Sequence, residues 1–280
     1  MVALITGQIT QVSPRVKRLL APNPGPFTGP GTNTYIVGKS ELVLIDPGPE
    51  IVSHIDTLVD ELAGNIRWIL VTHTHRDHSP AAALLKKRLG SSVEVLGMLS
   101  AHDGPSFDQD FISDRPFGHG DSIKTEEFTL TAIHTPGHAS NHLCYFLEEE
   151  ALLFSGDHLM DGSTVVIAPP DGHIASYIDS LSLLFDYPID VIAPAHGGLI
   201  SRAHEEIEKT IRHRLKREEN VRAALLLDSS RSISDLTPFV YDDVPVFMHL
   251  IAQQSLLAHL IKLEEDGEAS EQQGQWTLLK

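Results

Sequence analysis

The stretch VTHTHRDHSP, Val71 to Pro80, holds three histidines and an aspartate within six positions, directly after a short apolar run. The apolar run predicts a buried strand, and Pro80 suits the first turn of a following helix, where its missing N–H costs nothing. The polar side chains are therefore expected on a turn at the carboxyl end of a strand, where side chains can converge. The candidate ligands are His73, His75, Asp77 and His78. Their spacing suits two adjacent cations.

Four side chains cannot complete two metal sites, because a zinc ion usually takes four or five nitrogen or oxygen ligands. Three later segments offer further ligands: AIHTPGHAS with His134, FSGDHL with Asp157 and APAHGG with His196. Each segment follows a predicted strand and contains glycine, which lets the backbone approach a metal closely. A carboxylate can give one oxygen to each of two metals, which suits Asp157.

The composition is that of an ordinary globular protein. The chain has 280 residues, 41% of them hydrophobic, which predicts one large domain with a small appendage. Cys144 is the single cysteine, so no intramolecular disulfide can form and any metal site must use His, Asp or Glu.

The start of the chain and its apolar runs bear on location. MVALITGQITQV has neither a basic region nor a small-residue cleavage site, and no apolar run approaches the roughly 20 residues that span a bilayer. We therefore expect a cytoplasmic protein with no membrane contact.

Two regions differ in pattern. Residues 1–200 read as short strands alternating with helices, and residues 201–280 as mostly helical with a terminal hairpin. The change predicts a first domain over 1–200 and a second over 201–280. Helices followed by a small hairpin suggest a winged-helix-like unit.

The motifs together resemble a known family. HxHxDH at 73–78, a His in TPGH, Asp157 in SGDH and His196 in PAHG are similar to the metallo-β-lactamase superfamily of binuclear hydrolases. NPGPFTGPGTNTYIVG followed by LIDPG resembles, more narrowly, the β-lactamase-like protein 2 subfamily, whose members carry a small C-terminal winged-helix-like domain. The resemblance implies an α/β fold: a four-layer αβ/βα sandwich with the metals at one edge.

The resemblance also implies a ligand set of two zinc ions, with manganese or iron as alternatives. It assigns His73, His75 and His134 to the first metal, Asp77, His78 and His196 to the second, and Asp157 to a bridge. Asp46 in LIDPG matches a carboxylate that orients a ligand histidine, the other reading being a turn-forming Asp before Pro-Gly. His138 is expected to be a structural hydrogen-bonding residue. The commonest true β-lactamases place a cysteine where Asp157 stands, so dedicated lactam hydrolysis loses support.

The implied mechanism is hydrolysis by a metal-bound hydroxide. Two metals that share a water lower its pKa toward neutrality and polarise the group it attacks. Asp77 would both bind the second metal and orient the nucleophile. His158, next to the bridging aspartate, is expected to protonate a leaving group or hold substrate, or else to be an ordinary polar residue lining the cleft.

Three functions compete. The first is hydrolysis of a small-molecule or carrier-bound acyl substrate: a thioester, lactone, ester or, weakly, a lactam. The second is cleavage of single-stranded RNA, which the closer resemblance implies, but the net charge of −17 repels polyanions. The third is a non-enzymatic scaffold with a vestigial metal site, against which the intact ligand set argues.

The second region bears on partners. It holds 10 Lys or Arg against 14 Asp or Glu, so it does not imply nucleic-acid reading. Covering the cleft or forming a homodimer are its alternative roles.

Overall fold

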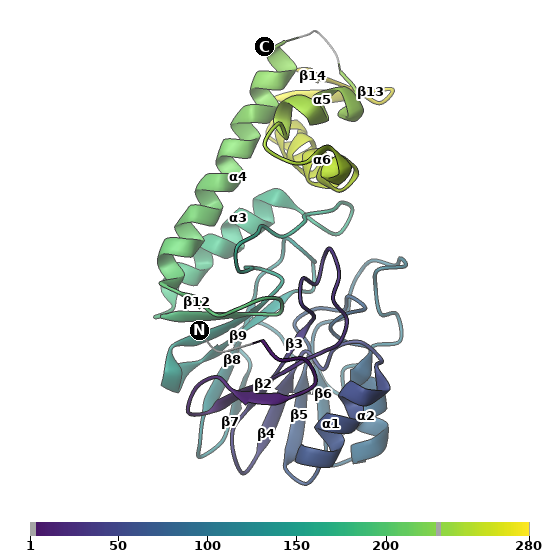
Figure 1. Ribbon diagram of the computed structural model, residues 1–280. Helices are drawn as coiled ribbons and strands as arrows, with labels where there is room; N and C mark the ends of the chain where they lie inside the picture. The colour runs from purple at the N-terminus through teal and green to yellow at the C-terminus, as the bar shows by residue number, and fades with distance from the viewer. Residues whose placement is uncertain (1–3, 228–230, 280) are drawn as a thin grey trace.

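A computed structural model describes residues 4–227 and 231–279. A broad body of two sheets and flanking helices carries a smaller helical unit, and the long helix α4 (Ala203–Leu226) runs from one to the other (Figure 1). The two-part organisation of the sequence is thus visible in space.

The first half of the chain forms a six-stranded sheet in sequential order. Its strands are β1 (Ile9–Gln11), β2 (Val16–Leu20), β3 (Asn33–Val37), β4 (Leu42–Ile45), β5 (Ile66–Leu70) and β6 (Glu94–Leu96). The first four pair antiparallel, whereas β4, β5 and β6 are parallel, because α1 (Val52–Leu62) and α2 (Ala81–Leu89) make the crossovers between them. The carboxyl ends of β4 and β5 therefore open on the same edge.

The second sheet also has six strands in sequential order, but only one of its pairs, β10–β11, is parallel. It contains β7 (Ser122–Lys124), β8 (Thr129–His134), β9 (Leu143–Leu147), β10 (Leu152–Gly156), β11 (Val191–Pro194) and β12 (Ile200–Ser201). β9 and β10 form a hairpin, and a short acidic 3-10 turn, η1 (Glu148–Glu150), connects them. β10 and β11 are parallel and are joined through α3 (Ile174–Leu183) and the 3-10 turn η2 (Leu184–Asp186).

Three apolar clusters hold the layers together. One lies between the sheets and includes Tyr35, Phe128 and Phe154. A second joins the first sheet to α1 and α2, and a third joins the second sheet to α3 and the start of α4. This helix–sheet–sheet–helix arrangement confirms the predicted four-layer sandwich.

The C-terminal unit has a core of its own. It comprises the second half of α4, α5 (Ile233–Val240), the 3-10 turn η3 (Val246–Met248), α6 (His249–Glu265) and the hairpin β13 (Ala269–Gln272) and β14 (Gln275–Leu278). Leu236, Leu256, Leu260 and Trp276 are buried together there. Helix α4 contributes Ile207 to the third cluster of the body and Val221 to this core, so the boundary predicted after residue 200 stays a prediction.

One helical segment departs from the expected absence of a membrane-length apolar run. Val246–Glu265 is long and apolar enough to cross a membrane, by length and composition only. Core helices of soluble proteins pass the same test, and α6 packs against α5 and β13 with Leu256, Leu260 and Leu263 buried. One face of the helix is thus a core element, while 33% of the apolar window as a whole is buried.

Candidate metal centre

The turn after β5 carries the predicted cluster of ligands. Strand β5 ends at Leu70, and the chain then turns over residues 72–80 before α2 begins. The backbone N–H of His78 donates to the carbonyl of His75 at 3.0 Å, which closes the turn and gathers the ligand side chains on one edge of the sandwich.

Three histidine nitrogens meet at one point. Nδ1 of His75 lies 2.9 Å from Nε2 of His73 and 3.0 Å from Nε2 of His138. Burial, with the neighbouring His138 and His78, lowers the pKa of His75 to about 3. Burial also holds the pKa of His73 well below its usual value. The rings of His73 and His75 are therefore neutral at physiological pH, and the neutral ring is the form that binds a metal.

A second group lies beside the first. Nε2 of His196 is 3.2 Å from Oδ2 of Asp77 and 3.3 Å from Oδ1 of Asp157, and Nε2 of His78 is 3.4 and 3.6 Å from the same two oxygens. This group can hold a cation with two nitrogens and two carboxylate oxygens.

Asp157 faces both groups. Its Oδ1 points to His78 and His196, whereas its Oδ2 lies 3.6 Å from Nε2 of His138. Gly156 makes this placement possible, because its φ is +50° and a Cβ there would lie 2.6 Å from the His142 ring and 2.7 Å from Thr72 Oγ1. A carboxylate with one oxygen toward each group matches the predicted bridge.

Asp46 orients one ligand. Its Oδ2 lies 2.9 Å from Nδ1 of His78 and accepts a hydrogen bond from the Thr72 hydroxyl at 2.8 Å. Its Oδ1 accepts from the Thr72 N–H, also at 2.8 Å. Because Nδ1 of His78 is engaged by Asp46, Nε2 faces the site. The structure therefore places Asp46 where an orienting carboxylate must lie.

Buried nitrogen and oxygen atoms without a hydrogen-bond partner indicate whether a metal fits this site. Among the described residues, Nε2 of His78, Nε2 of His196 and Oδ1 of Asp157 are buried without a hydrogen-bond partner. Buried polar atoms normally have partners, and a cation between these three would satisfy all of them. The donor set thus fits a divalent metal.

The charges of the second group also favour the binding of a divalent metal. Burial works to lower the pKa of His78, yet the carboxylates of Asp77, Asp157 and Asp46 raise it well above its usual value. Burial would likewise raise the pKa of Asp77, but the charge of His78 holds it low. A pocket that attracts a proton this strongly also attracts a metal ion, which displaces the proton on binding.

The prediction for His134 is wrong, and His138 takes its place. His134 is the last residue of β8, and its Nε2 lies 2.8 Å from the carbonyl of Ser140, away from the other ligands. The turn at Thr135–Gly137 carries the chain onward, so that His138 reaches His73 and His75. The other ligands all lie just beyond a strand, which is the signal that would have favoured His138.

The role predicted for His158 is not supported by its position. Its side chain is fully buried, its ring packs 4.8 Å from that of Tyr177, and burial lowers its pKa to about 3. It does not line the cleft above the metal groups, so it cannot protonate a leaving group there.

His142 belongs to the support of the site, although sequence reasoning did not single it out. Its Nδ1 lies 2.9 Å from Thr135 Oγ1, and its Nε2 accepts from the N–H of Asp157 at 3.2 Å. It therefore ties the bridging aspartate to the turn that carries His138.

A cleft of about 1060 Å³ leads to the metal groups. His75, Asp77, His138, Asp157 and His196 lie in its wall. Much of the remaining wall is apolar: Pro26, Phe27, Phe107, Met160, Val165, Val166, Met248, Leu250 and Ile251.

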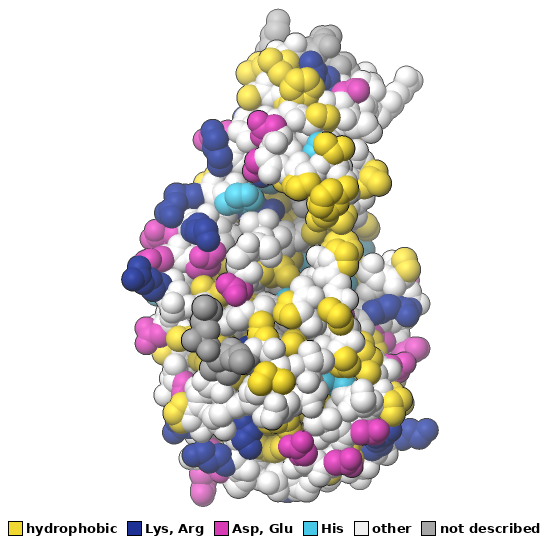
Figure 2. Space-filling view, in the orientation of Figure 1, with side chains coloured by type: hydrophobic (Ala, Val, Ile, Leu, Met, Phe, Trp, Pro, Cys, Tyr) yellow, Lys and Arg dark blue, Asp and Glu magenta, His cyan; other side chains and the backbone are white. Residues whose placement is uncertain are grey.

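An apolar rim lies beside the cleft: Val246 and Phe247 in η3 and Leu250 in α6, of which Leu250 lines the cleft itself. They are 80%, 81% and 77% exposed. Figure 2 shows hydrophobic side chains gathered on the part of the C-terminal unit nearest the body. The rim suits substrates that carry an apolar group.

The chain matches the model of the Metallo-beta-lactamase superfamily over residues 27–196, which include every candidate ligand. The chain belongs to this superfamily. Residues 232–276 match the Beta-lactamase associated winged helix domain, so this superfamily member also carries the predicted C-terminal unit.

Curated relatives extend over most of the chain. A Beta-lactamase-like protein 2 homolog of Caenorhabditis elegans is 33% identical and covers 92% of this chain and 87% of its own length. An atrochrysone carboxyl ACP thioesterase of Aspergillus novofumigatus is 29% identical and covers 92% and 81%. The metallo-beta-lactamase domain and its winged helix are therefore shared as a unit, and the chain is a hydrolase of this superfamily.

A solved structure shows the same fold. A Beta-lactamase domain protein from Burkholderia ambifaria has a TM-score of 0.82 at 21% identity, covering 98% of this chain and 94% of its own. The whole superfamily architecture, body and winged helix together, is thus found in a crystal structure.

Proposed function

We propose that this hydrolase uses two zinc ions to cleave a thioester or ester with an apolar acyl group. Manganese and iron are the alternative metals. The observation that carries the proposal is the position of Asp157, whose two oxygens face two separate ligand groups at the end of an apolar cleft.

The ligands divide between the two ions. His73, His75 and His138 would hold one ion, and Asp77, His78 and His196 the other, with Asp157 between them. Bound ions would supply a water of lowered pKa and an electrophilic partner for the substrate carbonyl.

Asp77 has a second task. It is partly exposed to the cleft, so its carboxylate can accept a hydrogen bond from the attacking water. As the water oxygen bonds to the carbonyl carbon, one of its protons passes to Asp77. The carbon–sulfur bond then breaks, and the thiolate leaves with its electron pair and takes that proton, so that a carboxylic acid and a thiol are released. No serine or cysteine nucleophile is required.

The cleft favours an acyl substrate over RNA. Arg76 is the single Lys or Arg in its described wall, against Asp77, Asp103, Asp157, Asp161 and Asp171. Phosphate contacts supply most nucleic-acid affinity, and this wall offers few. The relative named as an ACP thioesterase supports a thioester, either small or carrier-bound.

The test combines metal analysis with a substrate panel. Purified protein is assayed for zinc, manganese and iron, then offered an acyl thioester, an ester, a lactone, a chromogenic cephalosporin and a labelled single-stranded RNA. About two metals per chain and chelator-sensitive thioester or ester hydrolysis are expected. RNA cleavage without acyl turnover would replace this function by the nuclease. The homodimer and the cytoplasmic location stay predictions.

A further inference from the structure

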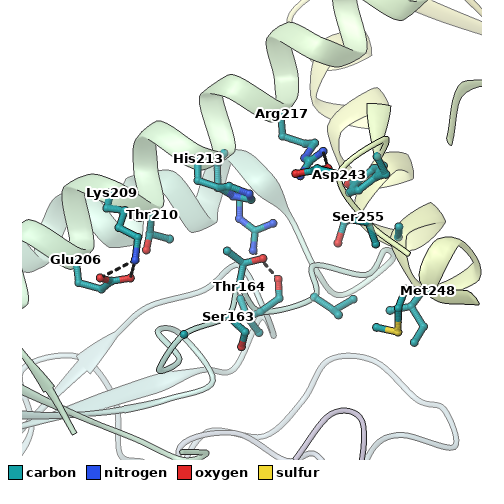
Figure 3. Close-up of a pocket in the computed structure, with 18 residues that line it drawn as sticks. Ser163, Thr164, Glu206, Lys209, Thr210, His213, Arg217, Asp243, Met248 and Ser255 are labelled. Atoms are coloured by element: carbon teal, nitrogen blue, oxygen red, sulfur yellow. Dashed lines mark hydrogen bonds and ion pairs between the residues drawn. The ribbon is translucent and has the colours of Figure 1, made fainter. Parts of the chain in front are cut away.

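A second cavity of about 440 Å³ lies between α4 and the start of α6. Its floor is the segment 162–166, and its wall includes Lys209, Thr210, His213, Arg214 and Arg217 of α4. Figure 3 shows the α4 side chains facing Ser163 and Thr164 across the cavity, with Met248 and Ser255 on the α6 side. One side of the basic run KTIRHRLKR, Lys209 to Arg217, thus lines a hollow.

Arg214 is a buried cation without a carboxylate. Its side chain is 3% exposed. One guanidinium nitrogen donates to the carbonyl of Val165, the group stacks over the Tyr177 ring at 5.2 Å, and Nε has no partner. Within residues 4–227 and 231–279 Arg214 forms no ion pair. Buried charges are ordinarily paired, so this position favours an anion that comes from outside the chain.

The other charges of the cavity leave this excess in place. Glu206 pairs with Lys209 at 2.9 Å, and Asp243 pairs with Arg217 at 2.8 Å. Each of these two carboxylates is therefore neutralised by a cation other than Arg214, and the charge of Arg214 stays uncompensated. Burial, and then the charges of Arg214 and Arg217, lower the pKa of His213.

Neutral groups around the cavity also lack partners. Nδ1 of His213 and the hydroxyl of Tyr241 are both buried without a hydrogen bond among the described residues. A group with several acceptor oxygens can meet donors that approach from different directions, and phosphate has three or four such oxygens. Arginine forks suit phosphate for the same reason.

The cavity is next to the metal cleft. Ser163, Thr164, Val165, Val166, Met248 and Ile251 line both. A single molecule with an anionic end and an acyl end can therefore contact both sides of the segment 163–166.

We infer that the second cavity binds a phosphate group between Arg214, Lys209 and His213. Two sources share this chemistry: the phosphate of a phosphopantetheine-type thioester and free inorganic phosphate. The first source rests on the proposed thioester hydrolysis, whereas the second does not.

The first measurement is phosphate binding by metal-loaded, full-length protein, by calorimetry and thermal unfolding at constant ionic strength. Arg214→Gln is expected to raise the Kd for inorganic phosphate about tenfold, the effect of losing one charged hydrogen-bonding group. Lys209→Met is expected to weaken binding several-fold. Arg212→Met is the matched control, because Arg212 is on the same helix, 68% exposed and paired with Glu208.

The second measurement separates the sources. The KM for an acyl-phosphopantetheine thioester is compared with that for the acyl-pantetheine thioester, which lacks only the phosphate. If the substrate supplies the phosphate, the phosphorylated thioester has the lower KM, and Lys209→Met removes the difference. If Lys209→Met weakens phosphate binding but not this KM ratio, the ligand is free phosphate.

The inference is overturned if wild-type protein binds no phosphate. It is also overturned if Arg214→Gln and Lys209→Met both bind phosphate as tightly as wild type, which is the result expected if the phosphate binds at the metals instead. Lys209→Met and His213→Gln carry the test if Arg214→Gln does not fold. If the protein hydrolyses no thioester but the variants lose phosphate binding, the proposed function is contradicted and the phosphate site is not.

Discussion

Nε2 of His138 lies 3.0 Å from Nδ1 of His75, at the point where Nε2 of His73 also arrives. His134, four positions earlier, is instead 2.8 Å from the carbonyl of Ser140. Of these two histidines, only four positions apart, His138 joins the group that could hold a metal ion, whereas His134 stays at the end of a strand.

His138→Ala and His134→Ala are matched variants for that assignment. His138→Ala removes a nitrogen from the first group, so we expect loss of about one metal per chain and at least a 100-fold fall in kcat/KM. His134→Ala is expected to keep both metals. Elemental analysis and hydrolysis rates check this, and loss of metal in the His134 variant alone would reverse the assignment.

Asp46→Asn tests the orientation of His78. The amide keeps the shape of the side chain but removes the charge that faces Nδ1 of His78. We expect the second group to bind its metal 10- to 100-fold more weakly, measured by competition with a chelator. Asp60→Asn, at an exposed position on α1, is the control. Equal affinities in the two variants would remove the orienting role.

Gly137 holds the turn that delivers His138. Its φ is +144°, and a Cβ there would lie 2.4 Å from the Cα of Tyr177 in α3. Gly137→Ala is expected to destabilise the fold by about 3 kcal/mol and to weaken metal binding at the first group. Gly120→Ala also has a positive φ but meets open space, so about 1 kcal/mol is expected. Urea unfolding compares them, and equal losses would show that the contact with α3 is unimportant.

His54 makes stability depend on pH. It is buried, Thr34 Oγ1 lies 2.9 Å from its Nε2, and burial lowers its pKa to about 4. The unfolded chain binds the proton at higher pH, so the free energy of unfolding falls as the pH drops from about 6.5 to 4, by at most about 3 kcal/mol.

The measurement for His54 is urea unfolding across that pH range. His54→Gln is expected to reduce the dependence without abolishing it, because His73, His75 and His158 also have pKa values lowered by burial, and exposed His119→Gln controls for the loss of a histidine as such. An identical pH dependence in wild type and His54→Gln would contradict the assignment.

Cys144 is expected to be inert in the folded protein. It is fully buried, it accepts a hydrogen bond from Thr135 Oγ1 at 3.3 Å, and burial raises its pKa to about 12. The thiolate is the reactive form, so a disulfide reagent at pH 8 should label no thiol until urea is added, and then one per chain. Rapid labelling of native protein would show that the second sheet opens.

The local pattern of apolar residues indicates most of the strands of this protein. Short apolar runs coincide with β3, β4, β5, β6, β8, β9, β10 and β11, because buried strands need such runs. Strand β2 interrupts its run with Lys17 and Arg18, and β1, β7 and β12 are two or three residues long, so their periodicity is too short to detect. They are held by pairing with neighbouring strands rather than by their own pattern.

The sequence by itself predicted the cluster at His73–His78, a bridge at Asp157, His196 and an orienting role for Asp46, because each follows an apolar strand and its position depends on a few neighbouring residues. Tertiary structure alone decided between His134 and His138 and removed His158 from the cleft. Those outcomes depend on the turn at Gly137, on its contact with α3, and on the packing of His158 against Tyr177. Contacts between residues far apart in the chain leave no local pattern, so only the packed fold reveals them.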